Sequence, residues 1–298
     1  MTDSFRSGFI TLIGRPNAGK STLLNHLIGE KIAITSDKPQ TTRNKITGIL
    51  SGADWQMIFV DTPGVHKPHD KLGDNMVRLA MNTLDEVDVI YYLVDATVPF
   101  GGGDAYLLEK LSNVKTPKFL LLNKIDRLEK LQVLPLIDFY RTKLDWQEII
   151  PISALKGDNV QAIIQATVPY LTEGPRYYPD DTVTDQPEQT LIAELIREKV
   201  LQMTRDELPH SVAVNVEQME RRTEDLVYIA ATIYVERDSQ KSIIIGKKGE
   251  MLKNIGTRAR ADIVRLMGNK IFLELHVKAK ADWRNKDKFL REMGYEGS

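Results

Sequence analysis

Residues 9–21 have the sequence Phe9-Ile10-Thr11-Leu12-Ile13-Gly14-Arg15-Pro16-Asn17-Ala18-Gly19-Lys20-Ser21. The first five of these residues form an apolar run that is typical of a buried strand. From Lys20 to Ile28, leucine and isoleucine recur at helical spacing, so we expect a helix directly after Gly19. A buried strand, a turn with two glycines and a helix, in this order, predict an α/β fold with the turn at the carboxyl end of a parallel strand.

The turn has the spacing of a P-loop, Gly14-x4-Gly19-Lys20-Ser21. In such a loop the backbone N–H groups converge on phosphate oxygens, and the positive end of the next helix strengthens their attraction. We expect Lys20 to reach the β and γ phosphates of a nucleotide and the Ser21 hydroxyl to bind Mg²⁺. A glycine-containing loop without a ligand is the alternative, and the flanking strand and helix weigh against it. Phosphate binding is therefore assigned to Gly14, Arg15, Pro16, Asn17, Ala18, Gly19, Lys20 and Ser21.

A second motif, Asp61-Thr62-Pro63-Gly64, follows the apolar run 56–60. An acidic residue at the end of such a strand is suited to act on the Mg²⁺ side of the nucleotide. The N–H of Gly64 can approach a γ-phosphate closely because glycine has no side chain. Since that contact exists only with a triphosphate, the segment after Gly64 is expected to act as a switch. Taken alone, Asp-x-x-Gly is a common and weak pattern.

The next residue is Val65, which stands where Ras-like enzymes have a glutamine that orients the attacking water. The side chain of valine can neither donate nor accept a hydrogen bond. We therefore expect either slow hydrolysis or a water molecule that another group positions. Val65 is assigned to the nucleotide site together with Asp61, Thr62, Pro63 and Gly64.

A third motif, Asn123-Lys124-Ile125-Asp126, follows the apolar run 118–122 and predicts the identity of the base. Guanine has two donors on one edge, its N1–H and its exocyclic amine, and one carboxylate can accept both. Adenine lacks this pair, so Asp126 is expected to select guanine while the Lys124 stem lies along the ring. A polar loop at a strand end is the alternative. Ser153-Ala154-Leu155-Lys156 follows another apolar run and is suited to supply a backbone N–H to guanine O6.

The first half of the chain alternates helix-length segments with buried runs at 9–13, 56–60, 89–94, 118–122 and 148–152. Strands that are apolar on both faces and alternate with helices indicate a mostly parallel sheet covered on both sides. We predict a P-loop GTPase domain over residues 1–174 and a turn-rich, polar connector over 175–187. A smaller α+β domain is predicted over 188–298.

The chain has 298 residues, of which 42% are hydrophobic and 27% charged, as in ordinary globular proteins of two domains. It contains no cysteine, which excludes disulfides, thiolate metal sites and a cysteine nucleophile. No run approaches the roughly 20 apolar residues that span a bilayer. The first apolar run is also too short for the core of a signal peptide. We therefore expect a cytoplasmic protein.

The second half has the element order helix, strand, strand, helix, turn, helix, strand. Its turn, Gly246-Lys247-Lys248-Gly249, fits the loop of a KH domain, which clamps about four nucleotides of single-stranded RNA. The order of elements indicates the type II KH arrangement. Residues 241–298 contain 14 Lys and Arg against 7 Asp and Glu, although the net charge of the chain is −1. This asymmetry favours a polyanion as ligand, and a solvated lysine-rich face is the alternative.

RNA contacts are assigned to Gly246, Lys247, Lys248, Gly249, Lys253 and Arg258. The arginines of the last helix, Arg258, Arg260 and Arg265, either reach phosphates or are solvated. The apolar residues around the loop are expected to be mostly core, with one or two lining the RNA groove: Ile243, Ile244, Ile245, Leu252 and Ile255.

Together the motifs resemble the Era-type GTPases over residues 9–283. The resemblance is carried by Ile13-Gly14-Arg15-Pro16-Asn17, Lys38-Pro39-Gln40-Thr41-Thr42-Arg43, Asp61-Thr62-Pro63-Gly64-Val65-His66-Lys67-Pro68 and Ile245-Gly246-Lys247-Lys248-Gly249-Glu250-Met251-Leu252-Lys253-Asn254-Ile255-Gly256. One minor departure is Ala18, where the family usually has a somewhat larger aliphatic residue.

The resemblance implies that the switch threonine, which binds Mg²⁺ in the GTP state, is Thr42, with Thr41 as the alternative because spacing alone does not choose between them. The expected metal ligands are then Ser21, Thr42 and Asp61, and the expected catalytic groups are Lys20, Asn17, Thr42 and Gly64. Related GTPases with an asparagine at the position of Asn17 use a bound K⁺ near the β–γ bridge. K⁺ is therefore a candidate cofactor beside GTP or GDP and Mg²⁺.

The resemblance further implies a bacterial-type GTPase that binds small-subunit ribosomal RNA near its 3′ end and assists assembly of the small ribosomal subunit. It also implies peripheral association with the inner face of the cell membrane, for which the residues give no independent support. We expect a monomer. The alternative function is a non-hydrolysing, GTP-dependent docking module whose C-terminal domain binds protein or membrane instead of RNA.

Overall fold

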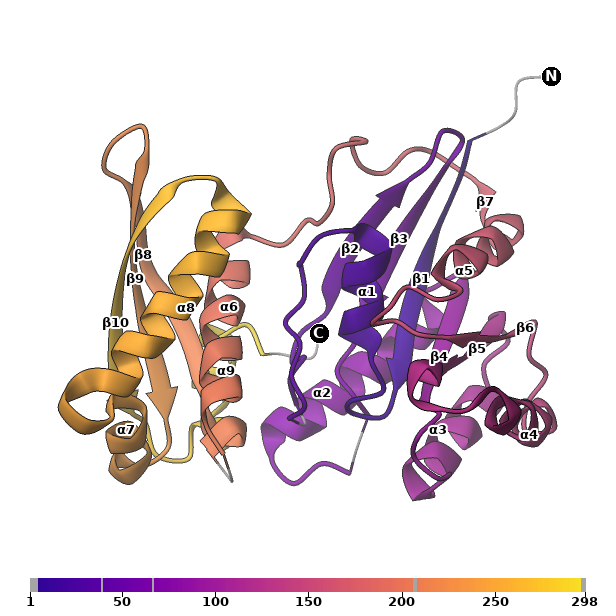
Figure 1. The fold of residues 1–298 in the computed structure, drawn as a ribbon, viewed down its shortest axis with the longest axis horizontal. Helices are drawn as coiled ribbons and strands as arrows, with labels where there is room; N and C mark the ends of the chain where they lie inside the picture. The colour runs from indigo at the N-terminus through magenta and orange to yellow at the C-terminus, as the bar shows by residue number, and fades with distance from the viewer. Residues whose placement is uncertain (1–4, 39, 66, 206–207, 296–298) are drawn as a thin grey trace.

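The computed structural model describes residues 5–38, 40–65, 67–205 and 208–295, which form two lobes joined by one connector (Figure 1). Pro39 and His66, which belong to the segments that carry the family resemblance, lie outside the described residues. Among the described helices, none combines the length and the apolar character that crossing a bilayer requires.

The first lobe is built on one sheet with the strand order β2-β3-β1-β4-β5-β6. Its strands are β1 (Arg6–Gly14), β2 (Ile46–Ser51), β3 (Trp55–Asp61), β4 (Val89–Asp95), β5 (Lys118–Asn123), β6 (Glu148–Ile152) and the short β7 (Thr172–Glu173). All neighbours from β3 to β6 run parallel, whereas β2 is antiparallel to β3 and β7 is antiparallel to β1. The mostly parallel sheet is confirmed. The edge strand β2 was not predicted, because Thr47 and Gly48 interrupt its apolar run.

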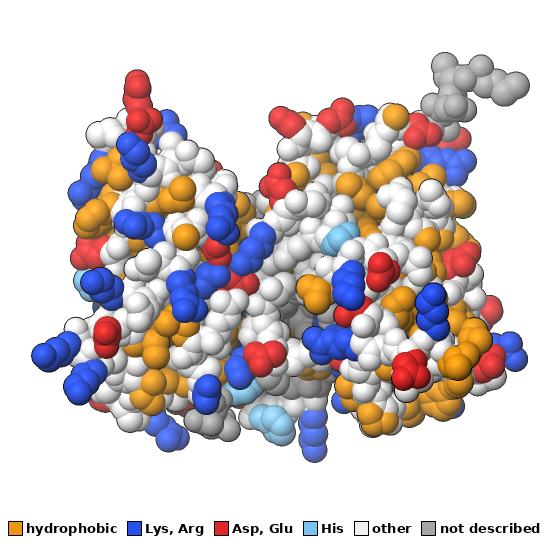
Figure 2. All heavy atoms as spheres, in the orientation of Figure 1, with side chains coloured by type: hydrophobic (Ala, Val, Ile, Leu, Met, Phe, Trp, Pro, Cys, Tyr) orange, Lys and Arg blue, Asp and Glu red, His pale blue; other side chains and the backbone are white. Residues whose placement is uncertain are grey.

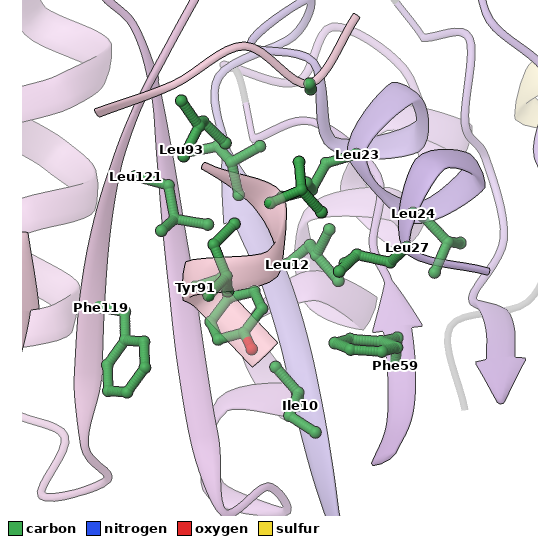
Figure 3. Close-up of a cluster of buried hydrophobic side chains, with 14 of the residues drawn as sticks. Ile10, Leu12, Leu23, Leu24, Leu27, Phe59, Tyr91, Leu93, Phe119 and Leu121 are labelled. Atoms are coloured by element: carbon green, nitrogen blue, oxygen red, sulfur yellow. The ribbon is translucent and has the colours of Figure 1, made fainter. Parts of the chain in front are cut away.

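Helices cover both faces of this sheet. On one face α1 (Lys20–Ile28) and α5 (Val160–Thr167) pack over Ile10 and Leu12 of β1, in the cluster drawn in Figure 3. On the other face α2 (Lys71–Asn82), α3 (Gly102–Ser112) and α4 (Lys130–Arg141) contribute to the cluster that contains Ile13. Because successive residues of a strand point to opposite faces, Ile10 and Leu12 pack on one side of β1 and Ile13 on the other. This packing fixes the carboxyl ends of the strands, where the motif residues lie.

The connector, residues 175–187, contains no helix or strand and lies along β2 and β3. The Gln56 side chain accepts from the N–H groups of Tyr177 and Tyr178 at 2.9 and 3.0 Å. The N–H of Ile49 donates to the carbonyl oxygen of Val183 at 2.9 Å. Backbone hydrogen bonds to the first sheet therefore hold a segment that has no regular structure of its own.

The second lobe contains α6 (Glu188–Met203), β8 (Ala213–Arg221), β9 (Leu226–Val235), α7 (Asp238–Ile245), α8 (Glu250–Met267), β10 (Lys270–Ala279) and α9 (Asp287–Glu292). Its sheet has the order β10-β9-β8, with β10 parallel and β8 antiparallel to β9. The smaller α+β domain with a type II KH arrangement is confirmed. Since α6 begins at Glu188, Pro187 lies just before the first turn and not within it.

The end of the chain returns to the first lobe (Figure 1). Phe289 of α9 packs against Trp283, and Tyr295 belongs to the same buried cluster. Leu72 and Met76 of α2 complete this cluster from the first lobe. An apolar contact therefore joins α2, which follows the second motif, to the second lobe.

Candidate nucleotide site

The P-loop connects β1 to α1 and borders a cavity of about 390 Å³. Residues 34–37 and 40–42 supply much of the remaining lining, together with Gly64, Lys124 and Arg127. Residues of all three motifs therefore meet at the carboxyl edge of the parallel sheet, where such sheets bind ligands.

Lys20 lies at the start of α1 with its amine over the loop. Its Nζ donates to the carbonyl oxygens of Gly14 and Arg15, each at 3.4 Å. Burial lowers the pKa of this amine, and the negative charge of Asp61 opposes that shift. Because both contacts are long, a phosphate oxygen would be a stronger acceptor for this ammonium group.

Three oxygen-bearing side chains meet next to the P-loop. Ser21 Oγ lies 2.8 Å from Thr42 Oγ1 and donates to Asp61 Oδ2 at 2.6 Å. Thr41 Oγ1 instead donates to the carbonyl oxygen of Lys38 at 2.6 Å. The structure thus brings together the three expected metal ligands, and it favours Thr42 over Thr41 as the switch threonine.

The chemistry of this set fits a hard divalent cation such as Mg²⁺. Within the described residues, Asp61 Oδ1 is buried without a hydrogen-bond partner, which is costly unless a cation or water compensates. Burial raises the pKa of Asp61 to about 6, against the opposing effects of Lys20 and of the two hydroxyl groups. Carboxylate and hydroxyl oxygens are ligands that Mg²⁺ prefers. The described part of the chain offers no cluster of three His, Asp or Glu side chains as another metal site.

Gly64 brings the second motif against the P-loop. A Cβ at this position would lie 2.8 Å from backbone atoms of Pro16, so only glycine allows the approach. Thr62 Oγ1 donates to the carbonyl oxygen of Leu12 at 2.8 Å, which anchors the motif to β1. Neither Thr62 nor Pro63 lines the cavity, so their contact with a nucleotide stays a prediction.

Val65 is directed into the core. Its side chain is 2% exposed and belongs to the cluster of Ile13 and Tyr92. Its N–H donates to the carbonyl oxygen of Gly14 at 3.2 Å. Its side chain therefore packs beneath the loop and does not line the nucleotide cavity, and the assignment of Val65 to the nucleotide site stays a prediction.

The third motif borders a second cavity of about 170 Å³, which shares Gly19 and Lys124 with the first. Asp126 lines this cavity, and its Oδ1 accepts a hydrogen bond from Ser153 Oγ at 2.7 Å. Lys124 Nζ pairs with Asp95 Oδ2 at 2.5 Å, which holds the lysine stem in place. Two adjoining cavities, one at the P-loop and one at Asp126, suit the phosphates and the base of one nucleotide.

Asn123 forms hydrogen bonds with the P-loop and with the loop that follows β6. Its Nδ2 donates to the carbonyl oxygen of Ala18 at 2.8 Å, and its Oδ1 accepts from the N–H of Ala154 at 2.9 Å. Ala154, one of the residues suited to supply an N–H to guanine O6, therefore bonds to Asn123 here. Ile125 lies in a short 3₁₀ turn and lines neither cavity, so its contact with a nucleotide stays a prediction.

Two side chains of the P-loop contact neighbouring segments. Arg15 Nη1 pairs with Asp104 Oδ2 of α3 at 2.8 Å, so its guanidinium is directed to α3 and only its backbone is suited to phosphate binding. Asn17 Nδ2 donates to the carbonyl oxygen of Asp37 at 2.7 Å. Asn17 therefore links the P-loop to the segment that carries Thr42.

The expected RNA-binding loop lies between α7 and α8 with both of its lysines exposed. Gly246 and Gly249 have φ values of 72° and 79°, a region that favours glycine. A Cβ on Gly246 would also lie 2.6 Å from that of Met251. The loop thus needs both glycines and presents Lys247 and Lys248 to solvent.

The surroundings of this loop are basic and partly apolar. Lys253 and Arg258 are exposed on α8, and Lys and Arg side chains gather over this lobe in Figure 2. Ile244 and Ile255 are buried in the core, whereas Ile243 is 54% exposed. This matches the expectation of mostly core residues and leaves Ile243 as a candidate groove contact.

The residues that join the nucleotide site to the second lobe were not predicted. Arg197 of α6 donates to the carbonyl oxygen of Thr41, and Glu198 accepts from the N–H of Thr35. Arg43 donates to the carbonyl oxygen of Val212 in the second lobe. All three are charged residues in buried positions. A single sequence carries no signal for such residues, because their burial depends on which surfaces meet in the fold.

A P-loop with an oxygen-rich metal site, a guanine-type motif beside it and a KH fold in the second lobe define a GTPase with an RNA-binding module. The sequence matches the family model described as 50S ribosome-binding GTPase over residues 9–124. It matches the model of the KH domain over residues 207–284.

The chain is also similar to solved structures of Era. One is a variant of Aquifex aeolicus Era bound to GDP and AlF4⁻, with 40% identity and a TM-score of 0.95, covering 98% of this chain and 100% of that chain. Another is Era in complex with MgGDPNP and nucleotides 1506–1542 of 16S ribosomal RNA, with 40% identity, a TM-score of 0.95 and coverage of 98% and 99%. The chain belongs to the Era family of GTPases.

Proposed function

We propose that this protein is a GTP-hydrolysing switch that binds the 3′ region of small-subunit ribosomal RNA through its KH domain and assists assembly of the small ribosomal subunit. The observation that carries the proposal is that one chain contains both the Ser21–Thr42–Asp61 cluster and an exposed Gly-Lys-Lys-Gly loop in a KH fold. The complex of Era with nucleotides 1506–1542 of 16S ribosomal RNA supports the choice of RNA.

The residues of the site have different roles in hydrolysis. The P-loop N–H groups and Lys20 bind the phosphates and orient them. Ser21, Thr42 and Asp61 would hold Mg²⁺, and the bound ion would supply positive charge that stabilises the charge of the phosphates. Because Val65 is directed into the core, a different group orients the attacking water. Slow intrinsic turnover is the expected consequence.

The choice of RNA is tested with a fragment that has the sequence of nucleotides 1506–1542. We expect the double variant Lys247→Ala/Lys248→Ala to bind it at least about tenfold more weakly, because two phosphate contacts and their counterion release are lost. GTP affinity should not change. The control variant Lys286→Ala/Lys288→Ala removes the same charge from exposed positions at the start of α9 and should bind RNA normally.

The dependence of RNA affinity on salt gives a second readout. The wild type should lose affinity steeply as the salt concentration rises, and the loop variant less steeply, since it makes fewer phosphate contacts. An unchanged RNA affinity in the loop variant would contradict the proposal. That result would favour the alternative of docking to a protein or a membrane.

We also propose that K⁺ acts near the β–γ bridge with Asn17 as one of its ligands. Asn17 lines the phosphate cavity, and because its Nδ2 donates to the carbonyl oxygen of Asp37, its Oδ1 is the atom that would coordinate K⁺. Turnover is compared in K⁺ and in Na⁺ at equal ionic strength. Faster hydrolysis in K⁺, lost in the Asn17→Ala variant, supports the proposal, whereas equal rates in the wild type overturn it.

We propose on the family resemblance alone that the protein is a cytoplasmic monomer with peripheral contact to the inner face of the cell membrane. Light scattering of the purified protein measures its mass, and fractionation of cells measures its distribution. The mass of a dimer would contradict the proposed monomer. Recovery outside the cytoplasmic and peripheral membrane fractions would contradict the proposed location.

A further inference from the structure

A buried arginine of the second lobe forms hydrogen bonds with the segment that carries Thr42. Arg197 of α6 is 0% exposed, and its Nη2 donates to the carbonyl oxygen of Thr41. Its Nη1 lies 3.5 Å from the carbonyl oxygen of Gln40. Glu194 fixes the guanidinium through two hydrogen bonds, from Nε to Oε1 at 2.8 Å and from Nη2 to Oε2 at 2.5 Å.

A second arginine, Arg43, extends from the first lobe and binds the second. Arg43 Nη1 donates to the carbonyl oxygen of Val212 at 2.6 Å, and Nη2 donates to that of His210 at 3.2 Å. Its guanidinium lies 5.6 and 5.5 Å from the ring centroids of Trp283 and Tyr295. The residues on both sides of Thr42 are therefore bonded to the second lobe.

Burying two guanidinium groups at one contact costs free energy, because each loses its hydration. Apolar side chains of similar volume would often join two lobes at least as stably. What the guanidinium adds is direction, since its planar set of donors fixes the position of the carbonyl groups that accept from it. The contact is therefore better suited to hold the backbone around Thr42 in one conformation than to stabilise the association of the two lobes.

The carbonyl group that Arg197 binds belongs to the peptide group that ends in the N–H of Thr42. A peptide group is planar, so fixing its carbonyl direction also restricts the backbone of Thr42. The Thr42 hydroxyl lies 2.8 Å from Ser21 Oγ in this arrangement. We propose that Arg197 is a positioning residue of the nucleotide site, supplied by the KH lobe, that holds Thr42 where it binds Mg²⁺ in the triphosphate state. The proposal rests on the role proposed above for Thr42.

The test compares the affinities of the full-length protein for a non-hydrolysable GTP analogue and for GDP, both with Mg²⁺. Since Thr42 serves the triphosphate state, only the analogue depends on its position. We expect Arg197→Met to weaken analogue binding about tenfold, the size of one hydrogen bond to a charged group, and GDP binding less than about twofold. Arg197→Lys keeps the charge and a donor and should recover part of the loss.

The matched control is Lys71→Met. It removes an exposed ion pair with Asp287 that also joins the two lobes but does not touch the segment 40–43. Both affinities should stay unchanged in this variant. Normal GDP binding also shows that the first lobe of each variant is folded. If Arg197→Met lowers both affinities equally, Arg197 has a purely structural role and the proposal is overturned. Unchanged affinity for the analogue would also overturn it.

Thr42→Ala separates this proposal from the one on which it rests. If Thr42→Ala does not lower analogue affinity relative to GDP, the role of Thr42 fails and the role of Arg197 falls with it. If it does, Arg197→Met should add little in the Thr42→Ala background, because both act through one hydroxyl group. Additive losses would contradict the proposal. If Arg197→Met does not fold, Glu194→Gln serves instead, because it weakens the hydrogen bonds that fix the guanidinium group of Arg197. This variant should lower the affinity for the analogue relative to GDP, and an unchanged ratio of the two affinities would contradict the proposal.

Discussion

The carboxylate of Asp126 is held in place by the loop that follows β6. Ser153 Oγ donates to Asp126 Oδ1 at 2.7 Å and accepts from the N–H of Lys156 at 3.1 Å. A short chain of hydrogen bonds thus runs from the backbone through Ser153 to the carboxylate that we expect to select the base. This gives Ser153 an orienting role in addition to its place in the loop.

Replacing Asp126 with asparagine should change the choice of base. The amide offers one donor and one acceptor where the carboxylate offers two acceptors, so it conflicts with one of the two guanine donors. We expect Asp126→Asn to bind GTP about tenfold to a hundredfold more weakly and xanthosine triphosphate more tightly than the wild type does. Competition between the two nucleotides measures this. Unaltered GTP affinity would show that Asp126 is not the base reader.

Val65 allows a second prediction at this scale. Restoring a Ras-like glutamine should not speed hydrolysis, because the side chain at this position is directed among Ile13 and Tyr92 and away from the cavity. We expect Val65→Gln to lower the free energy of unfolding by about 1–3 kcal/mol, the cost of burying an unpaired amide. Thermal unfolding and single-turnover hydrolysis measure the two effects. Faster hydrolysis at full stability would disprove the assignment of this side chain to the core.

At the scale of elements, α6 carries an ion cluster that joins three parts of the chain. Glu198 accepts from Lys31 Nζ at 2.5 Å, from Lys199 Nζ at 2.8 Å and from the N–H of Thr35 at 3.0 Å. Both lysines also pair with Asp262 of α8, at 3.3 and 2.5 Å. The segment 31–35, α6 and the helix that follows the RNA-binding loop are therefore linked by charge.

This cluster should make stability depend on pH. Burial raises the pKa of Glu198, but the hydrogen bonds from Lys199, Lys31 and Thr35 outweigh burial and leave the pKa below its usual 4.5. A carboxyl group with a lowered pKa in the folded state contributes stability above its unfolded pKa, and this contribution is lost as the pH falls through the folded value.

Glu198→Gln should therefore lower the free energy of unfolding by about 2 kcal/mol at neutral pH. The gap between wild type and variant should shrink as the pH falls below the ordinary value of 4.5. Urea unfolding of both proteins over this range measures the gap. A gap that does not change with pH would mean that the charge of Glu198 contributes nothing.

The strands and helices that could be predicted are those with a pattern of their own. The apolar runs of β1, β3, β4, β5 and β6 are long enough to mark buried strands, and the Gly-Lys-Lys-Gly loop marks α7 and α8 on either side. In contrast, β2 is stabilised mainly by pairing with β3, which the sequence of β2 alone does not show. The same holds for α9, whose Phe289 is buried only because Trp283 and α2 lie next to it.

For the site, the motifs predicted which residues meet but not how each one is used. Ser21, Thr42 and Asp61 lie together as expected. Arg15 and Val65 were assigned to the nucleotide by their position in a motif, yet their side chains point to α3 and to the core. A motif fixes the path of the backbone, whereas the direction of a side chain depends on partners far away in the sequence.

At the scale of the whole molecule, the segment made of residues 31–38 and 40–43 contacts both lobes. One side of it lines the phosphate cavity, and the other side bonds to α6. Ile34 even packs in the core of the second lobe, among the residues of α6. A change in this segment on nucleotide exchange would therefore act directly on the lobe that carries the RNA-binding loop.

The central claim is that the nucleotide sets RNA affinity through this shared segment. The most direct measurement is the Kd of the wild-type protein for an RNA with the sequence of nucleotides 1506–1542, with a saturating GTP analogue or with saturating GDP, both in Mg²⁺. We predict that RNA binds at least about fivefold more tightly with the analogue, within the ordinary range of coupling between two sites. Equal affinity with the two nucleotides would contradict the claim.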